Sequence, residues 1–278
     1  MIEKNKAYRI VVGDIHGDLS VFDKIYQREK EAADNEVFEV LVLGDYFDTH
    51  KGIKYEQQIE SFKYLLDLQK KHLKEHGDFI MLIGNHDFQY LDDSGTEHYS
   101  GYNPATYAVA HPLLVQARNK HKLKFAEVDI VNRTIYSHAG VTNTWLHERG
   151  KIDNPVNLID VLPYHLFKFT YGSHFDCYGN DPLNSPIWVR PGSLIPDMYK
   201  DIDMETKQET TWTQIVGHTP CMHPIIAHED GSQWKEDEMW QFAKFYDMDC
   251  LDKGYYLLET FDEDGKIKNR QIKNILTE

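Results

Sequence analysis

The sequence contains little cysteine, no long apolar run and too few basic residues to balance its acidic ones. Cysteine occurs three times in 278 residues, widely spaced and never as a CxxC pair. This usage excludes a zinc site held by thiolates and is typical of a reducing cytoplasm, which is the location we expect. The first apolar run is too short for a signal peptide, and no stretch approaches the roughly 18 apolar residues of a membrane span. We therefore expect no membrane partner.

The shortage of basic residues limits the possible ligands. Lysine and arginine number 30 against 45 aspartates and glutamates, which gives a formal net charge of −15. An acidic surface repels long polyanions, so general nucleic-acid binding is excluded, and an anionic substrate would need a local positive site. The hydrophobic content of 41% and the length are typical of one large α/β domain. We expect a single domain over residues 1–278.

A short apolar strand that leads into a metal-binding residue occurs five times. The polar turns are GDIHG at 13–17, GDYFD at 44–48, GNHD at 84–87, HAG at 138–140 and GHTP at 217–220. Ordinary strand-end turns would explain one or two of these, but not five that supply only Asp, Asn and His. Because open α/β sheets bind ligands at the carboxyl ends of their strands, the series predicts a site for two metal ions. We expect the glycine that precedes four of the ligands to leave room for an ion.

Apolar periodicity predicts a β-α-β-α-β run in the first third of the chain. Strands end near residues 12, 43 and 83, and an amphipathic stretch at 19–31 lies between the first two. A stronger helix pattern covers 56–76, with Ile59, Phe62, Leu66 and Leu73 as its apolar stripe. This order predicts parallel strands joined by right-handed crossovers.

The later part of the chain shows three further patterns. A helix is predicted over 104–119, and strands at 255–260 and 267–272 form a hairpin that closes on an Asp-Gly turn. Between them, the segment around 154–197 is rich in aromatic residues. It is interpreted as a cap-like hydrophobic lobe over the sheet, some of whose rings could wall the mouth of the site.

The five motifs occur in the order found in the calcineurin-like metallophosphoesterases. Within that superfamily the sequence most resembles the phosphoprotein phosphatase branch, which includes the symmetrical diadenosine tetraphosphatases. The resemblance spans positions 13–220, about three quarters of the chain. It implies an α/β fold of the four-layer α+β type, in which a central β-sandwich is flanked by helices. The dinuclear metal site lies at the carboxyl ends of the strands.

The resemblance also implies two divalent metal ions and assigns their ligands. The first ion would be held by three residues and the second by four, with Asp45 shared between them: Asp14, His16 and Asp45, then Asp45, Asn85, His138 and His218. Oxygen and nitrogen donors of this kind suit Mn or Fe, which we favour, and also Zn, Ni or Co.

The reaction implied is hydrolysis of a phosphoester by a hydroxide that bridges the two metals. His86 would protonate the leaving alkoxide, and Asp48 would orient the imidazole. Asn85 and Arg190 would contact the substrate phosphate. Taken alone, His86 could be a structural turn histidine and Arg190 a surface residue of a loop.

Two departures from the branch pattern affect the substrate and the metals. Thr49 stands where the branch usually has a phosphate-binding arginine, and a threonine hydroxyl does not replace a bidentate guanidinium. Lys51 could replace part of the lost charge. Pro220 stands where many phosphodiesterases of the superfamily have a last metal-binding histidine, which leaves the first ion three protein ligands.

Three functions follow from this pattern. The first is a phosphomonoesterase similar to serine/threonine phosphatases, acting on a phosphoprotein, a nucleotide or a phosphorylated small molecule. The second is a dinucleoside polyphosphate hydrolase, which the GHTP motif allows and the lack of a basic cluster disfavours. The third is a non-catalytic metal-binding scaffold, which we would expect to have lost ligands or His86. The sequence leaves the oligomeric state open.

Overall fold

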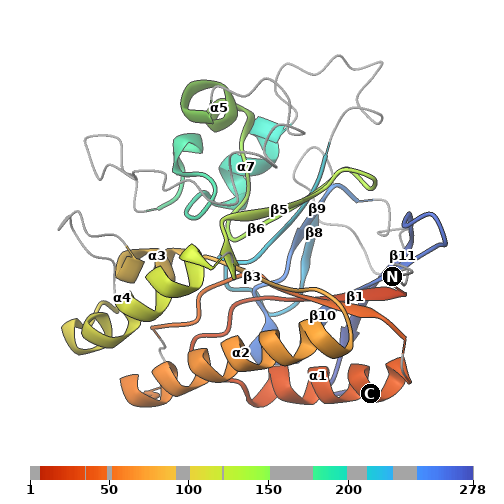
Figure 1. Ribbon diagram of the computed structural model, residues 1–278. Coiled ribbons are helices and arrows are strands. Elements are labelled where there is room, and N and C mark those ends of the chain that lie inside the picture. The colour runs from red at the N-terminus through yellow and green to blue at the C-terminus, as the bar shows by residue number, and fades with distance from the viewer. Residues whose placement is uncertain are drawn as a thin grey trace.

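The computed structural model describes residues 7–34, 36–48, 52–91, 101–120, 122–150, 178–198, 212–227 and 243–277. Over these residues the strands form two sheets that pack face to face, with helices on both outer sides (Figure 1). None of the helices in the described ranges is long and apolar enough to cross a membrane. Residues 154–177 of the expected cap lie outside this part of the chain, and the extent of the domain stays a prediction.

The first sheet has the strand order β11-β10-β1-β2-β3-β4 in the described part of the chain. Its strands are β1 (Tyr8–Val12), β2 (Phe38–Val42), β3 (Phe79–Leu82), β4 (Leu123–Lys124), β10 (Tyr255–Phe261) and β11 (Ile267–Asn274). The strands from β1 to β4 are parallel, and β10 pairs antiparallel with both β1 and β11. The predicted hairpin is therefore present, and its turn closes through the hydrogen bond from the Gly265 amide to the Asp262 carbonyl.

The second sheet has the order β5-β6-β7-β9-β8 over the described residues. It comprises β5 (Ala126–Asp129), β6 (Thr134–Ser137), β7 (Thr213–Val216), β8 (Ile225–Ala227) and β9 (Phe245–Asp247). The three middle strands, β6, β7 and β9, run parallel, whereas β5 and β8 are antiparallel edges. The carboxyl ends of the parallel strands of both sheets thus become available to a common site.

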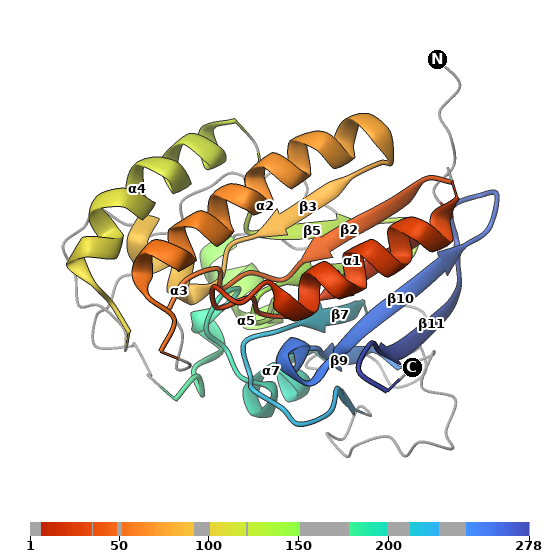
Figure 2. The same ribbon diagram turned by 90° about the horizontal axis from the view of Figure 1, so that it is seen from below.

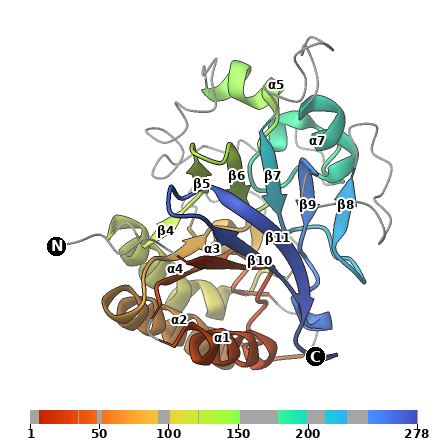
Figure 3. The ribbon, with the colours of Figure 1, turned by 90° about the vertical axis from the view of Figure 1, so that its right-hand side faces the viewer.

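Helices complete four layers. The helices are α1 (Ser20–Ala33), α2 (Tyr55–Glu75), α3 (Asn85–Leu91), α4 (Pro104–Asn119), α5 (Asn143–Trp145) and α7 (Pro191–Met198). A π-helical turn (Leu146–Gly150) and two 3-10 turns (Pro182–Asn184 and Leu251–Lys253) complete the described elements. Helices α1 and α2 lie side by side over the first sheet, with α4 beside α2 (Figure 2). In Figure 3 the layers follow from bottom to top as α1 and α2, the first sheet, the second sheet, and α5 and α7.

The central strands are continuous apolar runs in the sequence because both faces of each strand are buried. Ile10 and Val12 face the helices and belong to the large core with α1 and α2. Val11 and Leu41 point the other way and join Ile215 of the second sheet in a core between the sheets. The α/β four-layer fold class predicted from the sequence is confirmed.

The stripe predicted for α2 is partly wrong. Ile59 and Phe62 are buried as expected, but Leu73 is 49% exposed, and the buried face continues through Gln69 and His72. These two polar side chains tolerate burial because each reaches a backbone carbonyl. The Gln69 amide donates to Phe79 O at 2.9 Å, and His72 Nε2 lies 3.0 Å from Phe38 O.

Candidate metal and catalytic site

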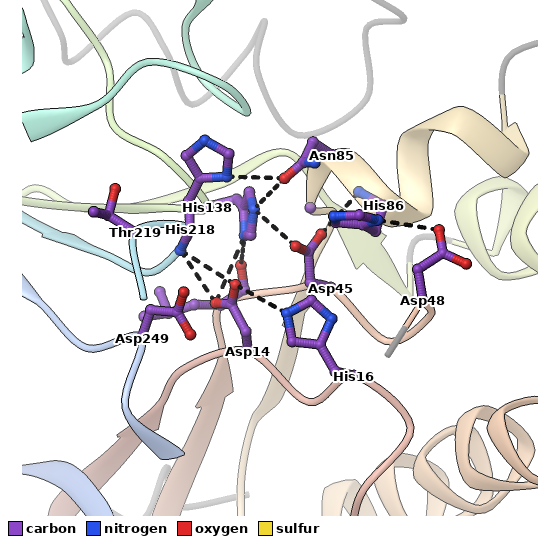
Figure 4. A network of polar contacts seen from close by, with 12 residues as sticks. Asp14, His16, Asp45, Asp48, Asn85, His86, His138, His218, Thr219 and Asp249 are labelled. Atoms are coloured by element: carbon purple, nitrogen blue, oxygen red, sulfur yellow. Dashed lines mark hydrogen bonds and ion pairs between the residues drawn. The ribbon is translucent and has the colours of Figure 1, made fainter. Parts of the chain in front are cut away.

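The predicted ligands and catalytic residues converge from five separate turns (Figure 4). They lie at the carboxyl ends of β1, β2, β6 and β7 and in the first turn of α3: Asp14, His16, Asp45, Asp48, Asn85, His86, His138 and His218. Four of them have positive φ angles, so the chain bends sharply where the side chains must meet: His16, Asp45, Asp48 and His218.

The first group of donors is compact. One ligand atom from each of Asp14, His16 and Asp45 lies within 4.8 Å of the others. His16 Nδ1 lies 3.1 Å from the Phe47 carbonyl oxygen, which fixes the proton on that nitrogen. The Nε2 lone pair is then free, and it faces Asp14 Oδ2 at 3.9 Å. A histidine oriented by a backbone carbonyl in this way is typical of metal ligation.

The second group shares Asp45 with the first. His138 Nε2 lies 2.9 Å from Asn85 Oδ1 and 3.4 Å from Asp45 Oδ2. His138 Nδ1 lies 2.9 Å from the Leu43 carbonyl oxygen. Because a carbonyl oxygen can only accept a hydrogen bond, Nδ1 carries the proton and Nε2 keeps its lone pair. His218 Nδ1 also lies 2.9 Å from Asn85 Oδ1. Lone pairs from these four side chains therefore point into one space, an arrangement that a cation stabilises.

Buried charge in the site favours positive ions. Burial raises the pKa of Asp14, and repulsion from Asp249 and Asp45 raises it further. Burial lowers the pKa of His138, but attraction by Asp45 outweighs that effect and the net pKa is raised. His218 Nε2 is buried and has no hydrogen-bond partner among the described residues. The donor set thus fits divalent cations, whose charge would relieve this repulsion.

His86 and Asp48 form a pair at the edge of the metal-binding space. His86 Nδ1 lies 3.1 Å from Asp48 Oδ2, and the same carboxylate accepts hydrogen bonds from the Gln89 amide and, at 2.6 Å, from the Tyr90 hydroxyl. Burial lowers the pKa of His86, but attraction by Asp45 and the bond to Asp48 raise it to about 9. Sequence reasoning missed Gln89 and Tyr90, although they lie three and four residues after His86 on one helix, the spacing that places side chains on one face.

Two of the four predicted glycines pack directly against ligand carboxylates. A Cβ atom added at Gly84 would overlap Asp45 Oδ1, and one added at Gly217 would overlap Asp14 Oδ1. The missing side chains thus make room for the ligand carboxylates rather than for an ion.

Arg190 lies beside the second group. Its Nη1 atom lies 3.4 Å from the His218 carbonyl oxygen and 3.3 Å from Thr219 Oγ1. The guanidinium is near enough to help lower the pKa of His218, after burial and the charge of His138. The ring of Trp188, from the aromatic segment, lies 5.3 Å from that of His218. Thr49 and Lys51 lie outside the described residues.

One carboxylate of the site was not predicted from the sequence. Asp249 lies two residues after β9, next to Asp14 (Figure 4). Burial raises its pKa to about 6, with an opposing effect of His16 and further repulsion by Asp45. The rule that found the other five turns, a strand followed by Asp, Asn or His, also applies here. The strand is only three residues long and no glycine follows it, so the pattern was not recognised.

Comparison with known proteins identifies the family. The sequence profile of the calcineurin-like phosphoesterases matches residues 9–251. The chain is a calcineurin-like phosphoesterase. Membership of this metal-dependent family makes it a hydrolase of phosphoesters that uses divalent ions, which confirms the resemblance and the enzyme class predicted from the motifs.

Relatives of this phosphoesterase include protein phosphatases. It is 30% identical over 146 residues to Shewanella-like protein phosphatase 1 of Plasmodium berghei (strain Anka), a match that covers 48% of the phosphoesterase and only 38% of the relative. The cold-active protein-tyrosine phosphatase of a psychrophilic Shewanella species has a TM-score of 0.54 at 17% identity, covering 96% of the phosphoesterase and 80% of that chain. A serine/threonine phosphatase of Saccharomyces cerevisiae has a TM-score of 0.51 at 12% identity, covering 98% and 80%. The two structures show a shared fold.

Proposed function

We propose that this phosphoesterase is a two-metal phosphomonoesterase that acts on phosphoserine or phosphothreonine in proteins. The main support for the proposal is that an imidazole and a guanidinium lie at the edge of the metal-binding space. The imidazole of His86, held by Asp48, lies at one edge, and the guanidinium of Arg190 lies beside His218. Such a site offers an acid for the leaving group and a cation for the phosphate. Shewanella-like protein phosphatase 1, which is 30% identical over 146 residues, is also a protein phosphatase by name.

The metal ligands in this proposal are those implied by the motifs. Asp14, His16 and Asp45 would hold the first ion. Asp45 would also bind the second ion, together with Asn85, His138 and His218. The two Asp45 oxygens face different sides, because Oδ1 accepts the His86 amide at 2.9 Å while Oδ2 faces His138. Divalent ions bound here supply Lewis-acid charge to the phosphoryl oxygens and lower the pKa of a water molecule. Because the proposed ligands are oxygen and nitrogen atoms, they favour Mn or Fe, with Zn, Ni and Co as further candidates.

His86 and Asp48 act on the leaving group. With Nδ1 held by the Asp48 carboxylate, Nε2 carries the proton that can be given to the leaving oxygen. The raised pKa of His86 keeps that proton available at neutral pH. A serine or threonine alkoxide is a much stronger base than a phenolate, whose conjugate acid has a pKa of about 10, and so it needs this proton more. The pair therefore favours aliphatic phosphoesters over phosphotyrosine.

Arg190 and Asn85 bind the phosphate in this proposal. Arg190 is half-buried and tethered through Nη1 to the turn that contains His218, so its other donors remain available to a phosphoryl oxygen. An arginine can contact two phosphoryl oxygens at once, which orients the group as well as attracting it. The Asn85 side chain lies between His138 and His218, where its amide can reach the same phosphate.

The experiment that tests the function is a hydrolysis panel with Mn²⁺-supplemented protein. It contains p-nitrophenyl phosphate, bis-p-nitrophenyl phosphate, phosphothreonine and phosphotyrosine peptides, and diadenosine tetraphosphate. The Asp45→Asn variant, purified in parallel, measures any contaminating phosphatase. We expect hydrolysis of the monoesters, fastest for the phosphothreonine peptide among the peptides, and near-total loss in the variant. Preference for the dinucleotide would assign the chain to the polyphosphate hydrolases, and inactivity on all five would support a scaffold.

A further inference from the structure

Asp249 occupies a position from which it can act on the first metal site. It lies two residues beyond β9, which pairs parallel with β7, so its side chain emerges at the same sheet edge as His218. Figure 4 shows its carboxylate next to that of Asp14. The charge of Asp249 is the strongest electrostatic influence of any side chain on Asp14. A third carboxylate therefore accompanies Asp14 and Asp45.

The backbone fixes this position from three sides. The Met248 amide donates to the Val216 carbonyl at 2.7 Å, and the Cys221 amide donates to the Asp249 carbonyl at 3.0 Å. The Asp249 amide donates to Asp247 Oδ1 at 3.1 Å. Gly13 packs so closely on the Met248 carbonyl that a Cβ atom there would overlap it. Because the turns after β1, β7 and β9 are held together, the backbone of Asp249 is fixed at the edge of the site.

Within the described residues, the carboxylate of Asp249 lacks the partners that a buried charge requires. Its Oδ2 atom is buried and has no hydrogen-bond partner there. His16 and His138 attract it. Asp14, Asp45 and Asp252 are the charged groups that repel it. Neither a lysine nor an arginine is among these groups. A buried carboxylate oxygen without a partner is costly, so a cation is the expected partner.

We propose that Asp249 is a further residue of the first metal site, where its carboxylate supplements the donors of Asp14, His16 and Asp45. The trio forms the compact group, and Asp249 lies at its margin. Asp249 is also next to the turn that contains Pro220, because the Cys221 amide donates to the Asp249 carbonyl. Pro220 itself has no side-chain atom that could bind a metal. The added negative charge raises the affinity of the first site for a divalent ion more than that of the second site. This inference rests on the proposed two-metal site.

The test compares metal binding in wild-type protein, Asp249→Asn and Asp252→Asn. Asp252 is an exposed acid in the 3-10 turn that follows, paired with Lys253 at 2.6 Å, so its replacement removes the same charge nearby. Metal-free proteins are titrated with Mn²⁺, and the number and affinity of bound ions are measured by calorimetry and electron paramagnetic resonance. We expect one of the two ions to bind about 10–100-fold more weakly in Asp249→Asn, and both to bind normally in Asp252→Asn.

Thermal unfolding separates this role from a purely structural one. Without metal, Asp249→Asn is expected to be at least as stable as wild type, because repulsion from Asp14 and Asp45 is removed. With Mn²⁺, its gain in melting temperature is expected to be smaller than that of wild type. Two ions bound with unchanged affinity in Asp249→Asn, or a destabilisation that is equal with and without metal, would overturn the inference. Failure of wild type to bind Mn²⁺ would instead refute the proposed function.

Discussion

The Nδ1 atom of His86 lies 3.1 Å from Asp48 Oδ2, although the two residues come from different elements. Asp48 belongs to the turn after β2, and His86 to the first turn of α3. The carboxylate is itself held by Gln89 and Tyr90, so it presents one fixed oxygen to the imidazole. The arrangement defines which nitrogen of His86 can act on a substrate.

Replacing His86 by alanine tests whether it is the acid. We expect turnover of a phosphothreonine peptide to fall about 10²–10⁴-fold with the metal content unchanged, because the imidazole donates a proton and does not bind metal. The loss should be smaller for p-nitrophenyl phosphate, whose leaving group barely needs protonation. Steady-state rates on the two substrates, with metal analysis of each preparation, provide the measurement. An equal loss on both would argue against the assignment.

The Asp48→Asn variant tests the pH dependence. A general acid works only while protonated, so activity is present below the pKa of His86 and is lost as the pH rises through it. The bond to Asp48 raises that pKa, and an asparagine would remove the negative charge that does so. We expect the alkaline limb of kcat/KM to move to lower pH in the variant. An alkaline limb at the same pH as in wild type would show that another group controls it.

The sequence predicted which side chains converge better than it predicted the parts around them. The turns that contain Asp14 and Asp45 follow long apolar strands, so their side chains could be assigned to a common edge from the pattern alone. Asp249 was not predicted because β9 has only three residues. The apolar neighbours Met248 and Cys250 also make the end of the strand hard to locate from hydropathy. The stripe of α2 was misjudged because hydropathy ranks His72 below Leu73. Burial of His72 depends on the position of the Phe38 carbonyl, which is a tertiary property.

Gly84→Ala should weaken metal binding without replacing a ligand. The φ angle of Gly84 lies outside the left-handed region, so an alanine there is strained only by its Cβ. That atom would overlap Asp45 Oδ1 and would lie 2.6 Å from the Asp45 backbone nitrogen, so the ligand must shift. We expect metal affinity to fall at least about 10-fold, as for other changes that misorient a ligand. Gly192→Ala, at an exposed position of α7 with nothing within 4 Å, is the matched control. Metal analysis after dialysis against a fixed free Mn²⁺ concentration measures the effect, and full metal content in Gly84→Ala would contradict it.

Arg190→Ala tests phosphate binding. Loss of a charged hydrogen-bond donor costs about 1.5–3 kcal/mol, which corresponds to a decrease in kcat/KM of roughly 10–100-fold. Arg190→Lys keeps the charge but not the planar fork, so its activity should lie between those of wild type and Arg190→Ala. Arg118→Ala, in the last turn of α4, serves as the control for loss of an arginine elsewhere. Initial rates over a range of phosphopeptide concentrations give kcat/KM, and an unchanged value in Arg190→Ala would place Arg190 outside the phosphate site.

His72 predicts a pH dependence of stability that is separate from catalysis. The side chain is fully buried in the C-terminal turn of α2, with Nε2 3.0 Å from the Phe38 carbonyl and Nδ1 3.1 Å from the Tyr26 hydroxyl. Burial lowers its pKa to about 4, with smaller opposing and reinforcing effects of neighbouring groups. The unfolded chain, with a pKa near 6.5, therefore takes up a proton more readily than the folded protein.

Stability from neutral His72 is thus fully present above about pH 6.5 and is lost as the pH falls toward 4. The whole loss amounts to roughly 3 kcal/mol at about 1.36 kcal/mol for each pKa unit. His72→Gln can keep a donor near Phe38 but does not titrate. We expect it to be less stable than wild type at pH 7.5 and to lose less free energy of unfolding between pH 7.5 and 5. Urea unfolding of metal-free protein measures both, since chelation removes the pH dependence of metal binding. The titration of the empty metal site is common to the two proteins and cancels in the comparison. Parallel losses in the two proteins would mean that His72 does not control this pH dependence.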